Sequence, residues 1–450
     1  MKPFTIAVIG GNAAGAAAAA KAKRVNPSAR VVLFEKTEFI SVGVCEFPFV
    51  LSGEIQNPAS LLFYTPEKFS EEKKVEVFVQ TEVVSINTKE RLVKFKIGDD
   101  AAEIELNYDK LILATGSRQG EFPGLDPELE NVLWLKKYPD LLRTKQYLET
   151  NRPNHATIIG SGYLGLEIAE AMVSRGMDVT IIEKLSHILP AAEPEFSAII
   201  EGLLKSKNVE IVNGYKNLSF SLDSNRVNAV KVDSLRIETG CVFPVIGFRP
   251  DTRLISGLDF KRGASGEIIT DAFTRTSVPH VYAAGDSTGV KNFLTGRNQV
   301  FYSAKVAHNT GHISGSNAAG RSEQFSGAIP VVSFRLFTRY FAQTGLTEKI
   351  AREHGFVTKS AFSLMPNLVH VMPESMDTAA KLIVNRLNNQ IIGASFWGGK
   401  EVSGLCDLIT LIIRNKMTYN SLLETDFNYT PALSPFRNIL ISLIHKIGKG

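Results

Sequence analysis

The sequence predicts an α/β protein with two Rossmann-like units and a smaller α+β domain at the C-terminal end. Three observations lead to this prediction. A Gly-rich turn lies near the N-terminus at residues 10–15, and a second one lies at residues 160–165. After about residue 323, short β-rich runs precede an apolar helix. The chain has 450 residues, which suggests about three domains of roughly 150 residues each.

The first unit begins with a short β-rich run, Ile6–Ile9, followed by the turn Gly10-Gly11-Asn12-Ala13-Ala14-Gly15. An Ala-rich helix to about Arg24 follows, and then a second strand, Val31–Phe34, which ends in Glu35. Such glycines let backbone N–H groups approach a pyrophosphate at the helix N-terminus. The terminal carboxylate can accept hydrogen bonds from ribose hydroxyls, so this unit predicts a dinucleotide site.

The second unit has the same order: strand Thr157–Ile159, turn 160–165, helix Leu166–Arg175, strand Val179–Ile182 and the acid Glu183. A single GxGxxG pattern is a weak signal. The alternative interpretation is two ordinary βα turns, which leaves the doubled arrangement, with its acid, unexplained. We therefore expect two dinucleotides.

Two further segments support this expectation. Lys110–Ser117 is a strand that runs into a turn, and Val281–Asp286 is a strand that ends in an acid. Taken alone, Asp286 has a second interpretation as a helix N-cap.

The last third predicts strands at Ile329–Phe334, Lys381–Val384 and Gln390–Phe396, and an apolar helix at Ser403–Ile413. These elements indicate a separate α+β domain. Residues Asn438–Lys449 are apolar and basic, which predicts a terminal helix packed on its own domain, with contact to a membrane surface as the minor alternative.

The composition excludes some classes of partner. A net charge of +4 is small for this length and gives no indication of nucleic-acid binding. Cys45, Cys241 and Cys406 are far apart and odd in number, so they form no disulfide framework and fit a reducing compartment. The N-terminus offers no signal peptide and no segment is long enough to span a bilayer, so we expect a cytoplasmic protein without membrane contact.

With the two turns, Ala-Thr-Gly-Ser at 114–117, Ala-Gly-Asp at 284–286 and the α+β domain, the chain resembles the flavin-dependent pyridine nucleotide–disulfide oxidoreductases over its whole length. The resemblance implies a discontinuous FAD-binding domain (1–115 and 245–322), an NAD(P)H-binding domain (116–244) and a dimerisation domain (323–450), hence a homodimer. It implies that FAD lies along Gly10, Asn12, Ala13, Ala14, Gly15, Glu35, Lys36, Ser41, Val83, Ala114, Thr115, Gly116 and Asp286. It implies that NADH or NADPH lies along Gly160, Gly162, Tyr163, Leu164, Gly165, Glu183 and Gly247.

Cys45 decides the subgroup. Relatives that resemble glutathione reductase carry a second cysteine at the position of Val50, so no local redox disulfide is available here. A lone sulfur has to cycle through a mixed disulfide, a persulfide or a sulfenic acid. The resemblance thus narrows to coenzyme A disulfide reductases, persulfide reductases, NADH peroxidases and water-forming NADH oxidases. The alternative for Cys45 is a buried small hydrophobic residue.

Within this subgroup, Ala13 stands where peroxidases and oxidases usually have a histidine, and Pro48-Phe49 resembles the residues after the cysteine of coenzyme A disulfide reductases. Both features favour a low-molecular-weight disulfide or persulfide as substrate. An NADH oxidase or peroxidase is the alternative, and a flavin-bound sensor without turnover is a more distant one. The resemblance implies that Tyr429 from the partner subunit faces the sulfur as a catalytic residue, whereas a second tyrosine of the relatives is replaced near Met372.

Four further expectations concern individual side chains. Lys21, Lys23 and Arg24 match a basic cluster that meets coenzyme A phosphates in relatives, or they are a solvated helix end. Glu183 favours NADH over NADPH, because a carboxylate repels a 2′-phosphate. Tyr163 either shields the flavin or is an ordinary side chain packed against its neighbours. A helix that begins near Glu46 is expected to lower the pKa of the Cys45 thiol.

We expect no metal site. His308 and His312 have the i, i+4 spacing of a zinc pair on a predicted helix, but no third ligand accompanies them.

Overall fold

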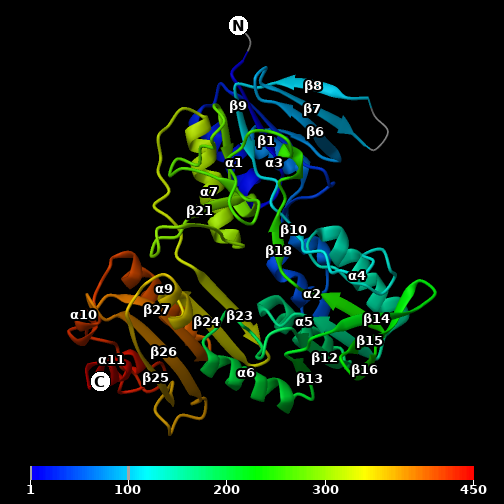
Figure 1. Cartoon of the computed structure of the whole chain (residues 1–450). Helices are drawn as coiled ribbons and strands as arrows, with labels where there is room; N and C mark the ends of the chain where they lie inside the picture. Colours follow the sequence, from blue (N-terminus) through cyan, green and yellow to red (C-terminus); the bar gives the residue numbers. More distant parts are fainter. Residues whose placement is uncertain (1–2, 99–101, 450) are drawn as a thin grey trace.

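The structure is a computed structural model that describes residues 3–98 and 102–449 (Figure 1). The N-terminal part is built on five parallel strands in the order β20-β9-β1-β2-β5. These strands are β1 (Thr5–Ile9), β2 (Arg30–Phe34), β5 (Glu76–Phe78), β9 (Lys110–Leu113) and β20 (Val281–Ala283). The outermost strand, β20, thus comes from a segment that follows β9 by more than a hundred residues in the sequence.

Two helices that are far apart in the sequence cover one face of this sheet together: α1 (Ala13–Val25) and α7 (Ala304–Ala318). Their backbones touch, because a Cβ atom added to Gly311 or Gly315 would lie 2.1 Å from the carbonyl oxygen of Ala14 or Ala18. The opposite face of the sheet packs on an antiparallel layer. That layer consists of β6 (Thr81–Asn87), β7 (Leu92–Ile97) and β8 (Ile104–Asn107).

The second sheet is parallel, with the order β13-β12-β11-β17. Its strands and main helices are β11 (His155–Ile159), β12 (Asp178–Glu183), β13 (Glu210–Asn213), β17 (Cys241–Pro244), α4 (Tyr138–Asn151), α5 (Tyr163–Ser174) and α6 (Pro194–Ser206). A smaller antiparallel sheet flanks it: β14 (Leu218–Asp223), β15 (Arg226–Val232) and β16 (Leu235–Glu238). The chain enters and leaves this part through two paired strands, β10 (Ser117–Gln119) and β18 (Phe248–Pro250).

The C-terminal part is an antiparallel sheet with the order β23-β24-β27-β26-β25 and helices packed on it. Its elements are β23 (Val331–Leu336), β24 (Arg339–Gly345), α8 (Glu348–Glu353), β25 (Thr358–Pro366), β26 (Asp377–Asn385), β27 (Ile391–Gly398), α9 (Glu401–Arg414), α10 (Tyr419–Leu423) and α11 (Ile439–Lys449). The predicted packing of the terminal helix is confirmed, since Leu440, Leu443 and Ile447 of α11 are buried in the core of this sheet.

Short elements complete the chain. They are β3 (Ile40–Val42), α2 (Phe47–Ser52), β4 (Leu62–Tyr64), α3 (Pro66–Lys73), β19 (Ile268–Ile269), β21 (Thr288–Lys291), β22 (Asn298–Val300) and 3₁₀ turns at Val44–Glu46, Pro58–Leu61, Arg253–Ile255 and Gly285–Ser287. The predicted α/β class is confirmed, and both predicted strand–turn–helix–strand units are present. The domain boundaries, 1–115 with 245–322, 116–244 and 323–450, stay a prediction. Among the helices of the described ranges, none is long and apolar enough to cross a membrane.

Candidate active site

The first glycine turn is shaped for close approach of the backbone. Gly10 has φ +106°, and a Cβ atom on Gly15 would lie 1.7 Å from the Gly10 carbonyl oxygen. Helix α1 begins after Asn12 without a hydrogen bond from a capping side chain. The N–H groups of its first turn are therefore available to an anion, and the positive end of the helix dipole favours one there. This geometry fits a pyrophosphate.

The second turn repeats these features. Gly160 has φ +105°, a Cβ atom on Gly165 would lie 2.2 Å from the Gly160 carbonyl oxygen, and Gly162 faces open space. Helix α5 likewise begins, at Tyr163, without a hydrogen bond from a capping side chain. The residues of both turns thus fit the pyrophosphates of two dinucleotides.

The other residues predicted to hold FAD lie around the same end of the N-terminal sheet, and several are tied to neighbours. The Ser41 N–H donates to the Gly11 carbonyl (3.0 Å), the Val42 N–H to Asn12 Oδ1 (3.0 Å) and Thr115 Oγ1 to the Asp251 carbonyl (2.6 Å), while Lys36 pairs with Glu82 (2.8 Å). Ala13 and Ala14 open α1, and Ala114 approaches Gly10. Val83 is buried in β6, and Gly116 takes a positive φ. Of the residues predicted to hold NAD(P)H, Gly247 also takes a positive φ, and Leu164 packs against the largest core cluster.

Asp286 is not a helix N-cap. It lies within the 3₁₀ turn Gly285–Ser287, which directly follows β20. Its carboxylate accepts a hydrogen bond from Ser117 Oγ (2.7 Å) and lies 3.4 Å from Lys136 Nζ. Lys136 also stacks over the Phe248 ring, 4.3 Å from its centroid. The Asp286 carboxylate is therefore held by Ser117 of β10 and by Lys136, which itself stacks on Phe248 of β18.

Cys45 is exposed, in the 3₁₀ turn that precedes α2. The expected lowering of its pKa is wrong for this structure. Partial desolvation raises the pKa of the thiol, and the carboxylates of Glu46, Glu167 and Asp286 raise it further, while Lys136 lowers it. Helix α2 has only six residues and begins after Cys45, so its dipole gives little help.

Helix α5 presents two titratable groups to the same region. Tyr163 and Glu167 are one helical turn apart. The charge of Glu167 raises the pKa of Cys45, and the charge of Cys45 raises the pKa of Tyr163. Burial raises the pKa of Tyr163 to about 12. Burial, with Glu170 as the next cause, raises the pKa of Glu167 to about 8 against the opposing effect of Arg335. A neutral carboxylic acid is thus held near the thiol at neutral pH.

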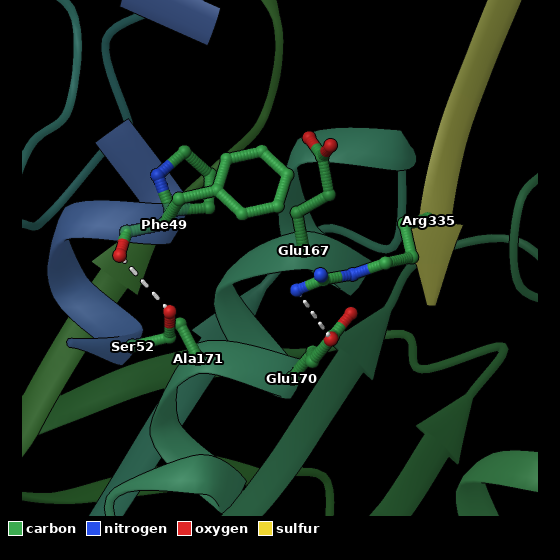
Figure 2. Close-up of a pocket in the computed structure, with 7 residues that line it drawn as sticks. Phe49, Ser52, Glu167, Glu170, Ala171 and Arg335 are labelled. Atoms are coloured by element: carbon green, nitrogen blue, oxygen red, sulfur yellow. Dashed lines mark hydrogen bonds and ion pairs between the residues drawn. The ribbon is translucent and has the colours of Figure 1, made fainter. Parts of the chain in front are cut away.

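A small pocket lies between α2, α5 and β23 (Figure 2). It is lined by Pro48, Phe49, Ser52, Glu167, Glu170, Ala171 and Arg335. Figure 2 shows the Glu170 carboxylate directed at the Arg335 guanidinium, whereas that of Glu167 points away from it. The two acids on one helix are therefore in different electrostatic environments.

The basic residues near the end of α1 have different surroundings. Lys21 pairs with Glu323 (3.5 Å), Lys23 donates to the Ala29 carbonyl (2.7 Å) and Arg24 is exposed. His308 and His312 of α7 stack beside them, with ring centroids 5.1 Å apart. Burial and then the charges of His308, Lys21 and Arg24 lower the pKa of His312. His312 is thus held neutral at neutral pH, and the positive charge near the end of α1 comes from the lysines and Arg24.

Tyr429 lies between α10 and α11 on an exposed segment, where its ring packs edge-on against Phe436 at 5.3 Å. Figure 1 shows α10 and α11 well separated from α2, so a single chain does not bring Tyr429 to Cys45. The two other cysteines, Cys241 and Cys406, are buried, with relative exposures of 0% and 2%. Cys45 is thus the exposed thiol of this chain.

Sequence reasoning missed four residues of this region: Ser117, Lys136, Glu167 and Arg335. Glu167 left one signal, since it follows Tyr163 by one helical turn on a helix already assigned to the site. The other three meet their acidic partners across 150 or more residues of sequence, as Lys136 meets Asp286. No local pattern reveals such pairs.

The comparisons with known proteins agree with this geometry. The model of the pyridine nucleotide-disulphide oxidoreductase family matches residues 4–311, and the model of that family's dimerisation domain matches residues 332–438. The chain is similar to the NAD(P)H sulfur oxidoreductase (CoA-dependent) of Pyrococcus abyssi, at 30% identity over 442 residues, which is 98% of this chain and 97% of the relative.

It is also similar to an NADH oxidase of Methanocaldococcus jannaschii, at 26% identity over 95% of each chain. Among solved structures, the NAD-dependent persulfide reductase from A. fulgidus superposes with a TM-score of 0.94 at 27% identity, covering 98% of this chain and 83% of the other. The chain is therefore a member of the pyridine nucleotide-disulphide oxidoreductase family, an oxidoreductase whose cofactors are FAD and NAD(P)H.

Proposed function

We propose that this chain reduces a low-molecular-weight disulfide or persulfide, with coenzyme A disulfide as the first candidate, through the single sulfur of Cys45. The observation that carries the proposal is the contrast between thiols: Cys45 is exposed beside α5, and Cys241 and Cys406 are buried. The relatives whose names include CoA-dependent sulfur reduction and persulfide reduction support it.

FAD is assigned to the first glycine turn with Glu35 and Asp286, and NAD(P)H to the second with Glu183. When bound, FAD accepts hydride from NAD(P)H and passes two electrons to sulfur. The domain 323–450 is assigned to a homodimer interface, a proposal supported by the match to the family's dimerisation domain.

The chemistry of the chain itself is thiol–disulfide exchange. The Cys45 thiolate attacks one sulfur of the substrate RS–SR′, so that a Cys45–S–SR bond forms, the RS–SR′ bond breaks and R′S⁻ leaves with a proton. Two electrons and a proton then release RSH and restore the thiolate. The sum is NAD(P)H + H⁺ + RSSR′ → NAD(P)⁺ + RSH + R′SH. A persulfide RSSH gives RSH and H₂S in the same way.

Protons for the leaving sulfur have two assigned donors. Glu167 is mostly protonated at neutral pH, because its pKa is raised to about 8. Tyr429 of the partner subunit is the second, and it needs the dimer to reach the site, since its own chain holds it apart from α2. The pKa of Cys45 is raised overall, and Lys136 is the charge that opposes this rise and so favours the attacking thiolate.

Substrate selection is assigned to the α1–α7 surface. Lys21 and Arg24 offer charge to a phosphorylated thiol such as coenzyme A. Lys23 is the weakest member of the predicted set, since its ammonium group already donates to the Ala29 carbonyl.

An NADH oxidase or peroxidase is the second candidate, favoured by the relative of that name. Ala13 speaks against it, because a methyl group at the start of α1 supplies no proton to reduced oxygen species.

The test is NADH consumption by the FAD-loaded protein, measured without oxygen and with coenzyme A disulfide, cystine or a coenzyme A persulfide, and then with oxygen alone. We expect turnover with a sulfur substrate that is lost in Cys45→Ser and kept in Cys406→Ala. Faster turnover with oxygen alone than with any sulfur substrate would favour the oxidase. Unchanged sulfur reduction in Cys45→Ser would reject the proposal.

A further inference from the structure

Arg335 joins three parts of the chain at one guanidinium group. It belongs to β23 of the C-terminal sheet. Its Nη1 donates to Glu54 Oε2 (2.9 Å), and its Nη2 donates both to Glu54 Oε1 and to Glu170 Oε1 (3.1 Å). Glu54 lies just beyond the end of α2, and Glu170 lies on α5. The C-terminal sheet is thereby connected to the two helices that flank the thiol region.

The same guanidinium also covers α2 directly. Its carbon lies 4.9 Å from the centroid of the Phe49 ring, which is the middle of the helix that begins two residues after Cys45. Figure 2 shows Phe49, Glu167, Glu170 and Arg335 around one small pocket. Stacking and bidentate pairing together need a planar fork, which arginine has and lysine does not.

The contacts of Arg335 with Glu54 and Glu170 are ion pairs. The hydrogen bond from Arg335 is the main cause that lowers the pKa of Glu54. Burial raises the pKa of Glu170, and the backbone at Phe337 and the Arg335 charge oppose it. One cation thus serves two carboxylates, one of them buried, so its loss leaves unpaired charge beside α2.

Helix α2 depends on tertiary contacts to hold its position. It has six residues, too few to be stable alone. It packs on α5 through Phe47, Val50 and Leu51, and the guanidinium of Arg175 donates to the Leu51 carbonyl (2.9 Å). Arg335 contacts both the half-buried Phe49 ring of this helix and Glu54, just after its C-terminus.

We infer that Arg335 is a positioning residue that fixes α2, and with it Cys45, against α5. The inference deepens the proposed function, since it rests on Cys45 as the reacting sulfur. Arg335 itself touches no reacting atom, and it acts from the C-terminal sheet through Glu54 and Phe49.

The test uses the full-length FAD-loaded protein and two measurements that need no disulfide substrate. The first is amide hydrogen exchange of the peptide 44–54, which reports local opening of α2. The second is the rate of Cys45 alkylation by iodoacetamide at a pH where the rate has levelled off, so that only access to the thiolate is compared. Cys241 and Cys406 are too buried to interfere.

We expect Arg335→Lys to speed exchange of this peptide about tenfold, the loss of roughly one charge-assisted hydrogen bond, and to speed alkylation as well. Glu54→Gln removes one arm at a half-exposed site and should act in the same direction without a risk to folding. The matched control is Arg226→Lys, because Arg226 also pairs bidentately with a carboxylate, Glu130, and lies over a ring, Tyr147, away from α2.

Unchanged exchange of residues 44–54 in both Arg335→Lys and Glu54→Gln overturns the inference. Faster exchange with an unchanged alkylation plateau also overturns it, because Arg335 would then support the fold without positioning the thiol. Neither result depends on turnover, so a failure here is distinguishable from a failure of the proposed reaction.

Discussion

Glu35 and Glu183 accept hydrogen bonds from the same position of their two glycine turns. The Gly11 N–H donates to Glu35 Oε2 at 2.8 Å, and the Ser161 N–H donates to Glu183 Oε2 at 3.0 Å. Each carboxylate lies at the end of the second strand of its unit and ties that strand to the turn just before the preceding helix. The repeat therefore extends from the backbone to the acid that faces a ribose in such units.

Glu183→Ala should shift the chain from NADH towards NADPH. The carboxylate repels a 2′-phosphate, so its removal is expected to raise kcat/KM for NADPH over NADH about tenfold. The KM for NADH should rise as well, because Ser161 Oγ (2.6 Å) and the Leu185 N–H (2.9 Å) lose their acceptor. Steady-state kinetics with both nucleotides measure this. Lys184→Ala is the neighbouring control, and an unchanged cofactor ratio in Glu183→Ala would show that another residue selects the nucleotide.

Glu167→Gln should make the protein less sensitive to alkaline pH. The folded state raises the pKa of Glu167 to about 8, so it binds a proton that the unfolded chain has released. The free energy of unfolding of the wild type therefore falls as pH rises from about 4.5 towards 8. Glutamine copies the protonated acid and should be about 1–2 kcal/mol more stable than wild type at pH 8, after allowance for screening, and nearly equal at pH 5.

Urea unfolding of the FAD-loaded protein at several pH values measures the difference. Glu201→Gln is a suitable control, because Glu201 is in an exposed i, i+4 pair with Lys205. A difference that is constant between pH 5 and 8 would contradict a raised pKa of Glu167.

Lys381→Met should destabilise the contact between the C-terminal sheet and the second nucleotide-binding unit. The Lys381 ammonium group lies within 2.8 Å of Glu193, 2.9 Å of Glu195 and 3.1 Å of Glu348, and it is buried. Its loss leaves Glu193 and Glu195 without this cation and Glu348 with Arg352 alone, and it should cost about 3–5 kcal/mol. Thermal unfolding measures the loss, with the exposed Lys205→Met as control, for which a change below about 0.5 kcal/mol is expected.

The loss of stability in Lys381→Met should also depend on pH. Burial raises the pKa of Glu348, but hydrogen bonds from Ser360 and Lys381 outweigh it and lower the pKa overall. The stabilisation by the Lys381–Glu348 pair is therefore present above the ordinary pKa of a glutamate and is lost as pH falls through the lowered pKa of Glu348. The difference between Lys381→Met and wild type should shrink in acid, and a difference that grew instead would exclude this ion cluster as its source.

The double variant Lys21→Ala/Arg24→Ala should raise the KM for coenzyme A disulfide and leave the KM for cystine unchanged, because only the first substrate carries phosphates. Removal of two cations from a phosphate contact is expected to cost about tenfold or more in kcat/KM. Lys68→Ala, at an exposed lysine of the N-terminal part, serves as control. Equal losses for both substrates would place these cations outside phosphate recognition.

Much of the fold could be predicted because its signals are local. The strand–glycine–helix–strand order around Gly10 and Gly160 is visible within about thirty residues, and so is the acid that ends each unit. Helix α7 was harder, since its buried face is made of small residues such as Gly311 and Ser314 and gives no apolar period. That face is understood only from α1, against which it packs.

The candidate site was predictable in its sulfur and its turns but not in its electrostatics. Cys45 is visible as a residue without a local partner, whereas its pKa depends on Glu167 and Asp286, which come from two other segments. Arg335 reaches Glu54 across 281 positions of sequence. Charged residues that come together only on folding produce no recognisable pattern in the local sequence.

The touching backbones of α1 and α7 bear on the order in which the protein assembles as it is synthesised. The ribosome has to translate past Ala318 before the second helix can close over the first, and past Ala283 before the sheet gains its outer strand. The unit around β11 is complete in the nascent chain well before that moment, although it is the later of the two in sequence. An insertion that delayed folding of this middle part would thus keep the two halves of the N-terminal part apart.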